Sequence, residues 1–311
     1  MSRHAGAIRV AVAGLVLTIL AGAATASDWS AGGAFLPLGH GARAHGLGGA
    51  VIAMGRDDAS AYWNPANLAW IEPGSSVTLM HAALFPEVDN GYQSLSFGMT
   101  HGPVLGEPVQ RLRPSQWGFG GFIGHLGLGF EAGDWTENRL QLAAAYALSN
   151  YASLGLAAPF MWLTNDFEGG NAQGGGFDAG LSALLTDALS VAFVVRDAYS
   201  EVQYDTDRSE KVAPGFELGI DYRWRTFEFE ADGTGREGGL QRAALGCEWR
   251  PHGELVALRG GWTALMAGES RGIPSAGAGV RTGSLVVDYG AAFDDADATG
   301  IGQRVSLRLV F

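Results

Sequence analysis

Apolar and charged residues alternate along most of the chain from residue 75 to its end. In residues 303–311, every second side chain is apolar, and two arginines lie between them. In residues 226–232, two phenylalanines alternate with acidic side chains. Successive side chains of a β-strand point to opposite faces, so this period of two predicts strands with one apolar and one charged face. We therefore expect an all-β fold.

The chain from residue 75 divides into strand-length runs separated by clusters of Gly, Asn, Asp and Pro. Short turns alternate with longer polar connections, expected near 125–138, 164–173, 199–211, 264–274 and 294–302. About fourteen strands with this asymmetry are typical of a single antiparallel transmembrane β-barrel. The connection 102–114 is longer than this pattern allows. The expected strands are 75–82, 91–101, 115–124, 139–148, 152–163, 174–185, 188–198, 212–224, 226–233, 240–249, 254–263, 275–282, 284–293 and 303–311.

Residues 1–26 have the pattern of a removable signal peptide, with early arginines, an apolar run and small residues at the end. We then expect an N-terminal segment over 27–74 and the barrel over 75–311. No later run of about 18 apolar residues predicts a membrane-spanning helix. The formal net charge of -12 argues against nucleic acid as a partner.

The charged face of the expected strands suits a confined lumen. It mixes both signs, and arginine is nearly the only base, since Lys211 is the only lysine. Arginine pairs bidentately with carboxylates, which favours ion pairs across a barrel interior. The members of this face are Asp178, Arg196, Asp221, Arg223, Glu228, Glu230, Asp232, Arg242, Glu248, Arg259, Asp288, Arg304 and Arg308.

The last strand carries a stripe of apolar side chains that ends in a terminal aromatic residue. Such an ending resembles the signal that the barrel-insertion machinery reads, so we expect this machinery and outer-membrane lipid as partners. The exposed aromatics Trp117, Trp224, Trp249 and Trp262 then suit an interfacial girdle. The proposed assembly signal consists of Val305, Leu307, Leu309 and Phe311.

Residues 39–71 form a segment rich in glycine and small residues before the first strand. Asp57 can cap a short helix over 58–63, and the pair Asn64-Pro65 can begin a second turn. Helices this short are marginal in water and need tertiary packing. We expect the segment to form a plug or hatch in the barrel, with Trp63, Leu68 and Trp70 as anchors and Arg43 facing a carboxylate of the lumen.

The same segment resembles the N-terminal signature of the PorV/PorQ family, which belongs with the FadL-like outer-membrane barrels. The resemblance covers Gly41–Ala44, Gly46–Ala50, Asp57-Asp58 and the run Tyr62, Trp63, Asn64, Pro65 and Ala66. It implies an outer membrane of a Gram-negative-type bacterium, and a role in protein export or surface attachment with secretion-system components or cargo proteins.

Two other functions remain open from the sequence. The first is a FadL-type uptake channel for hydrophobic small molecules, which should contain an apolar pocket within an otherwise polar lumen. An export shuttle should instead expose long loops that grip a partner. The second, from another class, is a secreted soluble β-protein that binds glycans, because a soluble sandwich has the same period of two.

Motifs for catalysis are lacking in the sequence. There is no HExxH spacing and no Gly-x-Ser-x-Gly turn, and His40 and His45 are poorly spaced for a metal. Asp57 and Asp58 are adjacent, so on a helix they would not face each other as an acid–base pair. We expect a non-enzymatic protein without a cofactor or metal.

Overall fold

A computed structural model describes most of the expected barrel and the segment before it. The described residues are 38–72, 74–83, 89–105, 114–131, 133–166, 171–206, 208–237, 239–251, 255–266, 270–294 and 302–311. The expected signal peptide and much of the 102–114 connection lie outside these residues. Within them, no helix has the length and apolarity needed to cross a bilayer.

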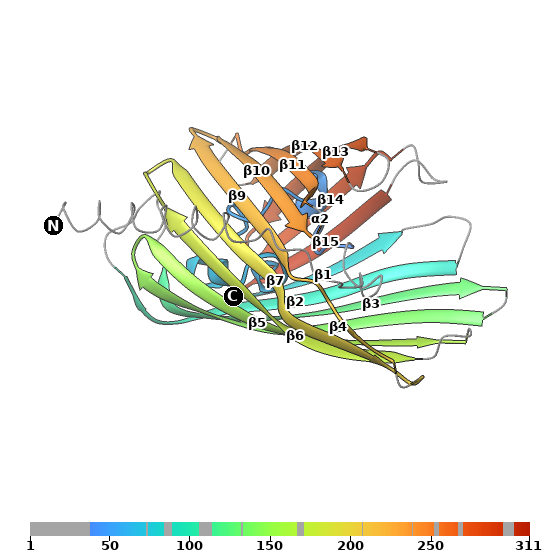
Figure 1. Ribbon diagram of the computed structural model, residues 1–311. Helices are drawn as coiled ribbons and strands as arrows, with labels where there is room; N and C mark the ends of the chain where they lie inside the picture. Colours follow the sequence, from blue (N-terminus) through green and yellow to red (C-terminus); the bar gives the residue numbers. More distant parts are fainter. Residues whose placement is uncertain are drawn as a thin grey trace.

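The strands form one antiparallel sheet that closes on itself by pairing β6 with β7 (Figure 1). The short β8 pairs with one part of β7, and β9 pairs with the rest, so β8 and β9 share one position in the wall. The described residues thus build a closed barrel of fourteen strand positions, which confirms the predicted fold class. The strands are β1 (Ser75–Ala83), β2 (Asp89–Val104), β3 (Ser115–Phe130), β4 (Gly133–Ser149), β5 (Ala152–Asn165), β6 (Ala172–Leu184), β7 (Leu189–Tyr204), β8 (Ser209–Lys211), β9 (Gly215–Trp224), β10 (Phe227–Arg236), β11 (Gly239–Trp249), β12 (Val256–Leu265), β13 (Arg271–Thr282), β14 (Leu285–Ala292) and β15 (Gly302–Val310).

One side of the barrel wall is much taller than the other. Strands β2 to β7 have 13 to 17 residues, whereas β9 to β15 have 8 to 12. A strand needs about 9–11 residues to cross a bilayer. The longer strands therefore extend about 5–20 Å past the membrane along its normal. We call the end with short turns such as 150–151 and 225–226 the turn end, and the opposite end, where β2 to β7 project, the loop end.

Two of the expected loops are wrong, because the strands of the tall wall extend into them. The stretch 125–138 is mostly strand, because β3 continues to Phe130 and β4 begins at Gly133. Residues 199–204 belong to β7 and 209–211 to β8. Their polar composition predicted loops. These parts of the strands lie outside the membrane, however, and a strand face in contact with water is also expected to be polar.

At membrane level the barrel is apolar outside and charged inside. Val305, Leu307 and Leu309 are each 46% exposed on the outer face of β15, whereas Arg304 and Ser306 are buried. Trp224 and Trp249, at the turn end, each stack on Phe227 with ring centroids 6.0 Å apart. A closed barrel with this surface belongs in an outer membrane, as predicted. The soluble alternative does not account for this outer face.

The residues before β1 lie inside the barrel, as the blue ribbon in Figure 1 shows. We call residues 38–72 the luminal segment. It contains α2 (Ala42–Gly46), α3 (Ser60–Trp63) and the 3₁₀ helix η1 (Pro65–Trp70). Helix α2 contacts β12 to β15, and η1 contacts β2 to β6. The segment thus reaches from one wall of the lumen to the other.

The outer face of β15 provides a test of the membrane placement. Leu307→Arg should destabilise the folded barrel by about 2–4 kcal/mol, because a lipid-facing arginine near the midplane is costly. Val256→Arg, at the turn end of β12, places the same charge nearer the interface and should cost about 0–1 kcal/mol. Urea unfolding in liposomes measures both. Equal effects of the two substitutions would contradict the placement.

Candidate functional site

Two carboxylates of β10 bind the backbone of the luminal segment. Asp232 Oδ2 accepts hydrogen bonds from the N–H groups of Val51 (2.8 Å) and Ile52 (3.1 Å). Glu230 accepts from the next two N–H groups, those of Ala53 (2.5 Å) and Met54 (2.7 Å). Four consecutive donors that have no helix or sheet partner are thereby satisfied by the wall.

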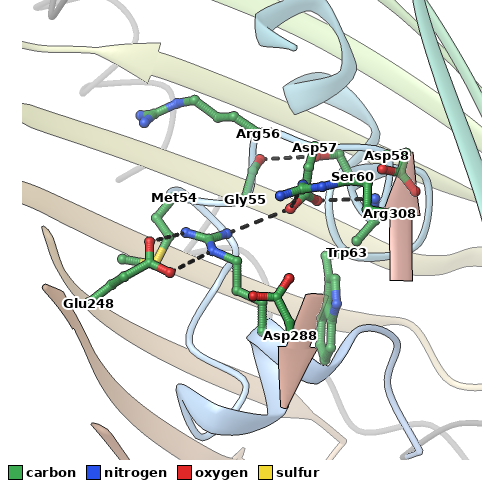
Figure 2. A network of polar contacts seen from close by, with 12 residues as sticks. Met54, Gly55, Arg56, Asp57, Asp58, Ser60, Trp63, Glu248, Asp288 and Arg308 are labelled. Carbon is green, nitrogen blue, oxygen red and sulfur yellow. Dashed lines mark hydrogen bonds and ion pairs between the residues drawn. The ribbon is translucent and has the colours of Figure 1, made fainter. Parts of the chain in front are cut away.

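Glu248 of β11 is the centre of an ionic network beneath this turn, and its side chain is fully buried. Arg43 of α2 donates to both carboxylate oxygens of Glu248 at 3.0 Å, in the bidentate geometry expected of arginine. Arg259 also donates to Glu248, and its Nη1 donates to Asp288 at 2.7 Å. Figure 2 shows Glu248 and Asp288 facing this network from the wall. The luminal segment therefore supplies one cation of a buried cluster.

Asp57 and Asp58 point to different partners. Asp57 Oδ2 accepts from Arg308 Nη1 at 2.7 Å (Figure 2), and Asp58 accepts from the hydroxyls of Ser76 and Ser96. Burial raises the pKa of Asp58, and the neighbouring Asp57 charge adds to this effect. Burial also opposes ionisation of Asp57, but nearby arginines, chiefly Arg308, outweigh it and lower its pKa. Asp57 is thus the ion-pairing member of the two.

The two short helices begin differently from each other. Helix α3 starts at Ser60, not at residue 58 as expected, and Asp57 Oδ1 accepts the N–H of Ala59 in the turn before it. Asn64 has the extended backbone and capping bond predicted for the residue before Pro65, since its Oδ1 accepts the N–H of Ala66 at 3.0 Å. Its amide also donates to Ser182 of β6 at 2.9 Å, which ties the cap to the wall.

Arg196 of β7 caps the C-terminal end of α3. Its guanidinium donates to the backbone carbonyls of Tyr62 and Trp63. The guanidinium carbons of Arg196 and Arg139 lie 5.8 and 5.4 Å from the centroid of the Tyr62 ring. Trp63 donates its indole N–H to the carbonyl of His40 at 2.8 Å. Both aromatics are therefore engaged within the segment and with the wall.

Glycines of the wall allow the segment to lie directly against the strands. A Cβ on Gly155 would lie 2.2 Å from the nitrogen of Ala66, and one on Gly261 would lie 2.2 Å from the carbonyl carbon of Leu47. Such distances are far shorter than any real contact. Sequence reasoning missed this role, although the 48 glycines of the chain were a signal for it.

His40 is held between two serines of β2, with Nδ1 2.8 Å from Ser94 Oγ and Nε2 2.7 Å from Ser96 Oγ. Burial lowers its pKa to about 4, against an opposing effect of Asp57. His40, Ser96 and Asp58 therefore make a connected polar chain, but all three are fully buried. We interpret this chain as a structural contact between the segment and the wall.

A small cavity, of about 30 Å³, lies at this level among Arg43, Asp57, Trp63, Asp288 and Arg308. This volume is enough for one or two water molecules in polar surroundings. It does not admit an organic molecule.

The loop end of the lumen has the opposite polarity. Above the membrane, the outward side chains include the exposed His125, Thr164, Gln173 and Gln203. The inward side chains include two apolar clusters. One consists of Met161, Leu163, Ala172, Val202 and Val212, and the other of Met80, Ala82, Tyr92 and Leu126, with Leu38 and Leu128 packed against it. The barrel therefore has an apolar inner mouth above a charged, filled lumen.

A hollow adjoins the second cluster, and its volume is about 20 Å³. Aromatic and aliphatic side chains form most of its wall, and polar groups of β4 form one edge. Its lining includes Leu38, Tyr62, Tyr92, Phe122, Leu126, Glu137, Asn138 and Arg139.

The residues expected to direct assembly lie along the seam of the barrel. Phe311 is 72% exposed, and its backbone exchanges hydrogen bonds with Ser75 at the start of β1. The stripe of Val305, Leu307 and Leu309 faces outward on the same strand. Their recognition by the insertion machinery stays a prediction.

Comparison with known proteins connects this architecture to solved barrels. Neither a known family profile nor a curated protein matches the chain. The toluene transporter TodX of P. putida has a TM-score of 0.65 at 12% identity, covering 88% of this chain and 99% of TodX. The monoaromatic hydrocarbon channel CymD has a TM-score of 0.64 at 15% identity (89% and 99% covered). A FadL homologue of Pseudomonas aeruginosa has a TM-score of 0.59 at 12% identity (89% and 99% covered). The chain therefore has the fold of FadL-type barrels.

Adjacent glycines of β12 test how the segment fits the wall. Gly261→Ala should loosen the segment, because the new methyl group would overlap the backbone of Leu47. Gly260→Ala is the matched control, since a Cβ there would have no atom within 4 Å. Hydrogen exchange of residues 45–50 should accelerate only in the first variant. Unchanged exchange in Gly261→Ala would show that the segment does not lie against this strand.

The Glu248 cluster supports a second test. Glu248→Gln keeps the side-chain shape but leaves buried Arg43 and Arg259 without their shared carboxylate, a change that costs about 3–5 kcal/mol when a buried pair is broken. Conductance steps in planar bilayers should become larger or more frequent. Glu201→Gln, which removes an exposed carboxylate at the loop end, should leave the conductance unchanged. A closed Glu248→Gln barrel would show that this cluster does not hold the segment in place.

Proposed function

We propose that this protein is an outer-membrane channel for small hydrophobic molecules and that the luminal segment is its gate. The observation that carries the proposal is the change of polarity along the lumen. Apolar side chains line the loop end, and a charged, filled level lies below it. This matches the expectation that an uptake channel contains an apolar pocket within an otherwise polar lumen. The similar folds of a toluene transporter and a monoaromatic hydrocarbon channel add support.

The physical steps follow from this arrangement. A hydrophobic molecule gains free energy when it leaves water for the inner face around Leu163 and Val202. It cannot continue through the level of Arg43 and Glu248 while that level holds only water-sized space. Passage therefore requires the luminal segment to shift. Its hydrogen bonds and ion pairs with the wall make the closed state the resting one.

The same proposal assigns a role to each part of the chain. Residues 1–26 direct export, 27–74 act as the hatch, and 75–311 form the barrel, whose last strand guides insertion. Within the hatch, Arg43 and Asp57 form ionic contacts with the wall, and the run from Tyr62 to Ala66 fixes the junction between α3 and η1.

Protein export is the second candidate, favoured by the resemblance of residues 41–66 to the PorV/PorQ signature. The projecting strands β2 to β7 would then serve as the surface for cargo proteins or secretion components. Their polar outward face suits a protein partner, but this function gives no role to the apolar inner face.

Uptake of radiolabelled toluene by cells that depend on this barrel distinguishes the two candidates. Changing Val202→Thr together with Leu163→Asn makes the inner mouth polar, and uptake should fall about tenfold. Gln203→Asn, on the outward face beside Val202, is the control and should leave uptake unchanged. If uptake persists in the double variant, or the wild-type barrel admits no toluene, the hydrophobic channel is excluded and export becomes the better candidate.

A further inference from the structure

A patch of polar side chains borders the apolar outer face of strands β1 to β4. It takes one outward residue from each of these four adjacent strands (Figure 1). The strand register places each member directly opposite the next, so the four side chains lie side by side. Three of them are exposed and the fourth, Asn138, is half-buried. We call His81, Gln93, His125 and Asn138 the polar patch.

The polar patch begins where the lipid-facing surface ends. Two residues closer to the turn end on each strand, the outward side chain is apolar. These apolar residues, again opposite one another, are Leu79, Leu95, Ile123 and Leu140. Two residues of a strand span about 7 Å, so the patch lies at the level of the lipid headgroups. The loop end of a bacterial barrel faces the outside, which makes these the headgroups of the outer leaflet.

Apolar side chains bound the patch on both sides. Val305 of β15 is opposite His81 and is 46% exposed, and Trp162 of β5 is opposite Asn138. A tryptophan is common at the membrane interface, because one part of its ring is apolar and its N–H is polar. The patch is therefore a bounded surface three strand spacings, or about 14 Å, wide.

The members of the patch contact each other in two pairs. His125 Nδ1 donates to Asn138 Oδ1 at 2.8 Å, and Gln93 Nε2 is 3.5 Å from His81 Nδ1. The first contact uses the amide oxygen of Asn138, and the second uses Nδ1 of His81. The NH₂ group of Asn138 and Nε2 of His81 are the donors that these contacts leave for a ligand.

Two glycines keep the wall open beside the patch. On β2 and β3, the next outward residues toward the loop end are Gly91 and Gly127, which are opposite each other. A Cβ on Gly91 would lie 2.5 Å from Gln93 Nε2, and one on Gly127 would lie 3.7 Å from His125 Nε2. The ends of these two side chains therefore lie over bare backbone, where a flat polar ring has access to them.

We propose that the polar patch binds the headgroup of a glycolipid in the outer leaflet, through its sugar hydroxyls and a phosphate. Amide and imidazole groups both donate and accept hydrogen bonds, as sugar hydroxyls do, and their N–H groups bind phosphate oxygens. None of the four side chains is a carboxylate, although the chain has 32 acidic residues. The acyl chains of the same lipid lie on the apolar row that contains Leu79 and Ile123. This function is separate from transport, because the patch faces away from the lumen.

Titration of the full-length protein in detergent micelles, read by native mass spectrometry, tests the assignment. The probes are lipid A, which is a phosphorylated glycolipid, and phosphatidylglycerol, which has a phosphate but no sugar. The test variant combines His81→Leu with His125→Leu. His101→Leu is the matched control, because it removes an exposed histidine of β2 that lies near the turn end. Heat-modifiable mobility on gels establishes that each variant is folded.

We expect wild-type protein and His101→Leu to bind lipid A about 10–100-fold more tightly than the double Leu variant does, as the loss of two or three hydrogen bonds allows. Asparagine at both positions keeps an N–H donor and should restore part of the affinity. Phosphatidylglycerol should bind equally to all variants.

Undiminished binding of lipid A by the double Leu variant overturns the site, as does a wild-type protein that does not bind lipid A. An equal loss of affinity for both lipids shows recognition of any lipid phosphate and overturns the glycolipid assignment. If the double variant does not fold, Gln93→Leu is measured in its place, and an unchanged affinity for lipid A there decides against the patch.

Discussion

The structure depends on giving the buried polar groups of the lumen partners where the cavity between them has room for only one or two water molecules. A closed barrel of this width has a charged inner wall, and the luminal segment has backbone donors that no helix or sheet satisfies. The wall and the segment satisfy each other's polar groups. Glu230 and Asp232 accept four consecutive N–H groups, and Arg196 donates to the last carbonyls of α3. Buried groups of this kind are expensive when unpaired, so the segment and the wall are stable only together.

The period of two was enough to predict the fold class and the faces of the strands. Leu307 outside and Arg308 inside follow from alternation alone, and Asn64-Pro65 identified a helix start from local chemistry. Alternation could not predict which wall residues contact the luminal segment. Arg43 and Glu248, for example, are 205 positions apart in the sequence and meet only when the barrel closes. The prediction of a loop at 125–138 was wrong for a different reason. Polar outward residues indicate contact with water, but strands that extend beyond the membrane are in contact with water just as loops are.

The inverted polarity of the tall wall connects fold to transport. Within the membrane, lipid requires apolar side chains outside, which leaves the charges for the lumen. Above the membrane, the same alternation can run the other way, and the inward side chains become apolar. Strands β4 to β7 continue across this boundary, with a register shift between β6 and β7 near Phe177. Val202 and Arg196 therefore lie on one strand but line regions of opposite character. Under the proposed channel function, the apolar end is where a hydrophobic molecule would bind, and the charged level is the barrier that it would meet next.

Arg304 lies at the boundary of these two regions, and its surroundings differ from those of three other lumen arginines. Arg43, Arg259 and Arg308 lie at the level where carboxylates of β11, β14 and the luminal segment converge. Arg304 lies in the row of Ala82, Tyr92 and Leu126, where the inner face has already become apolar.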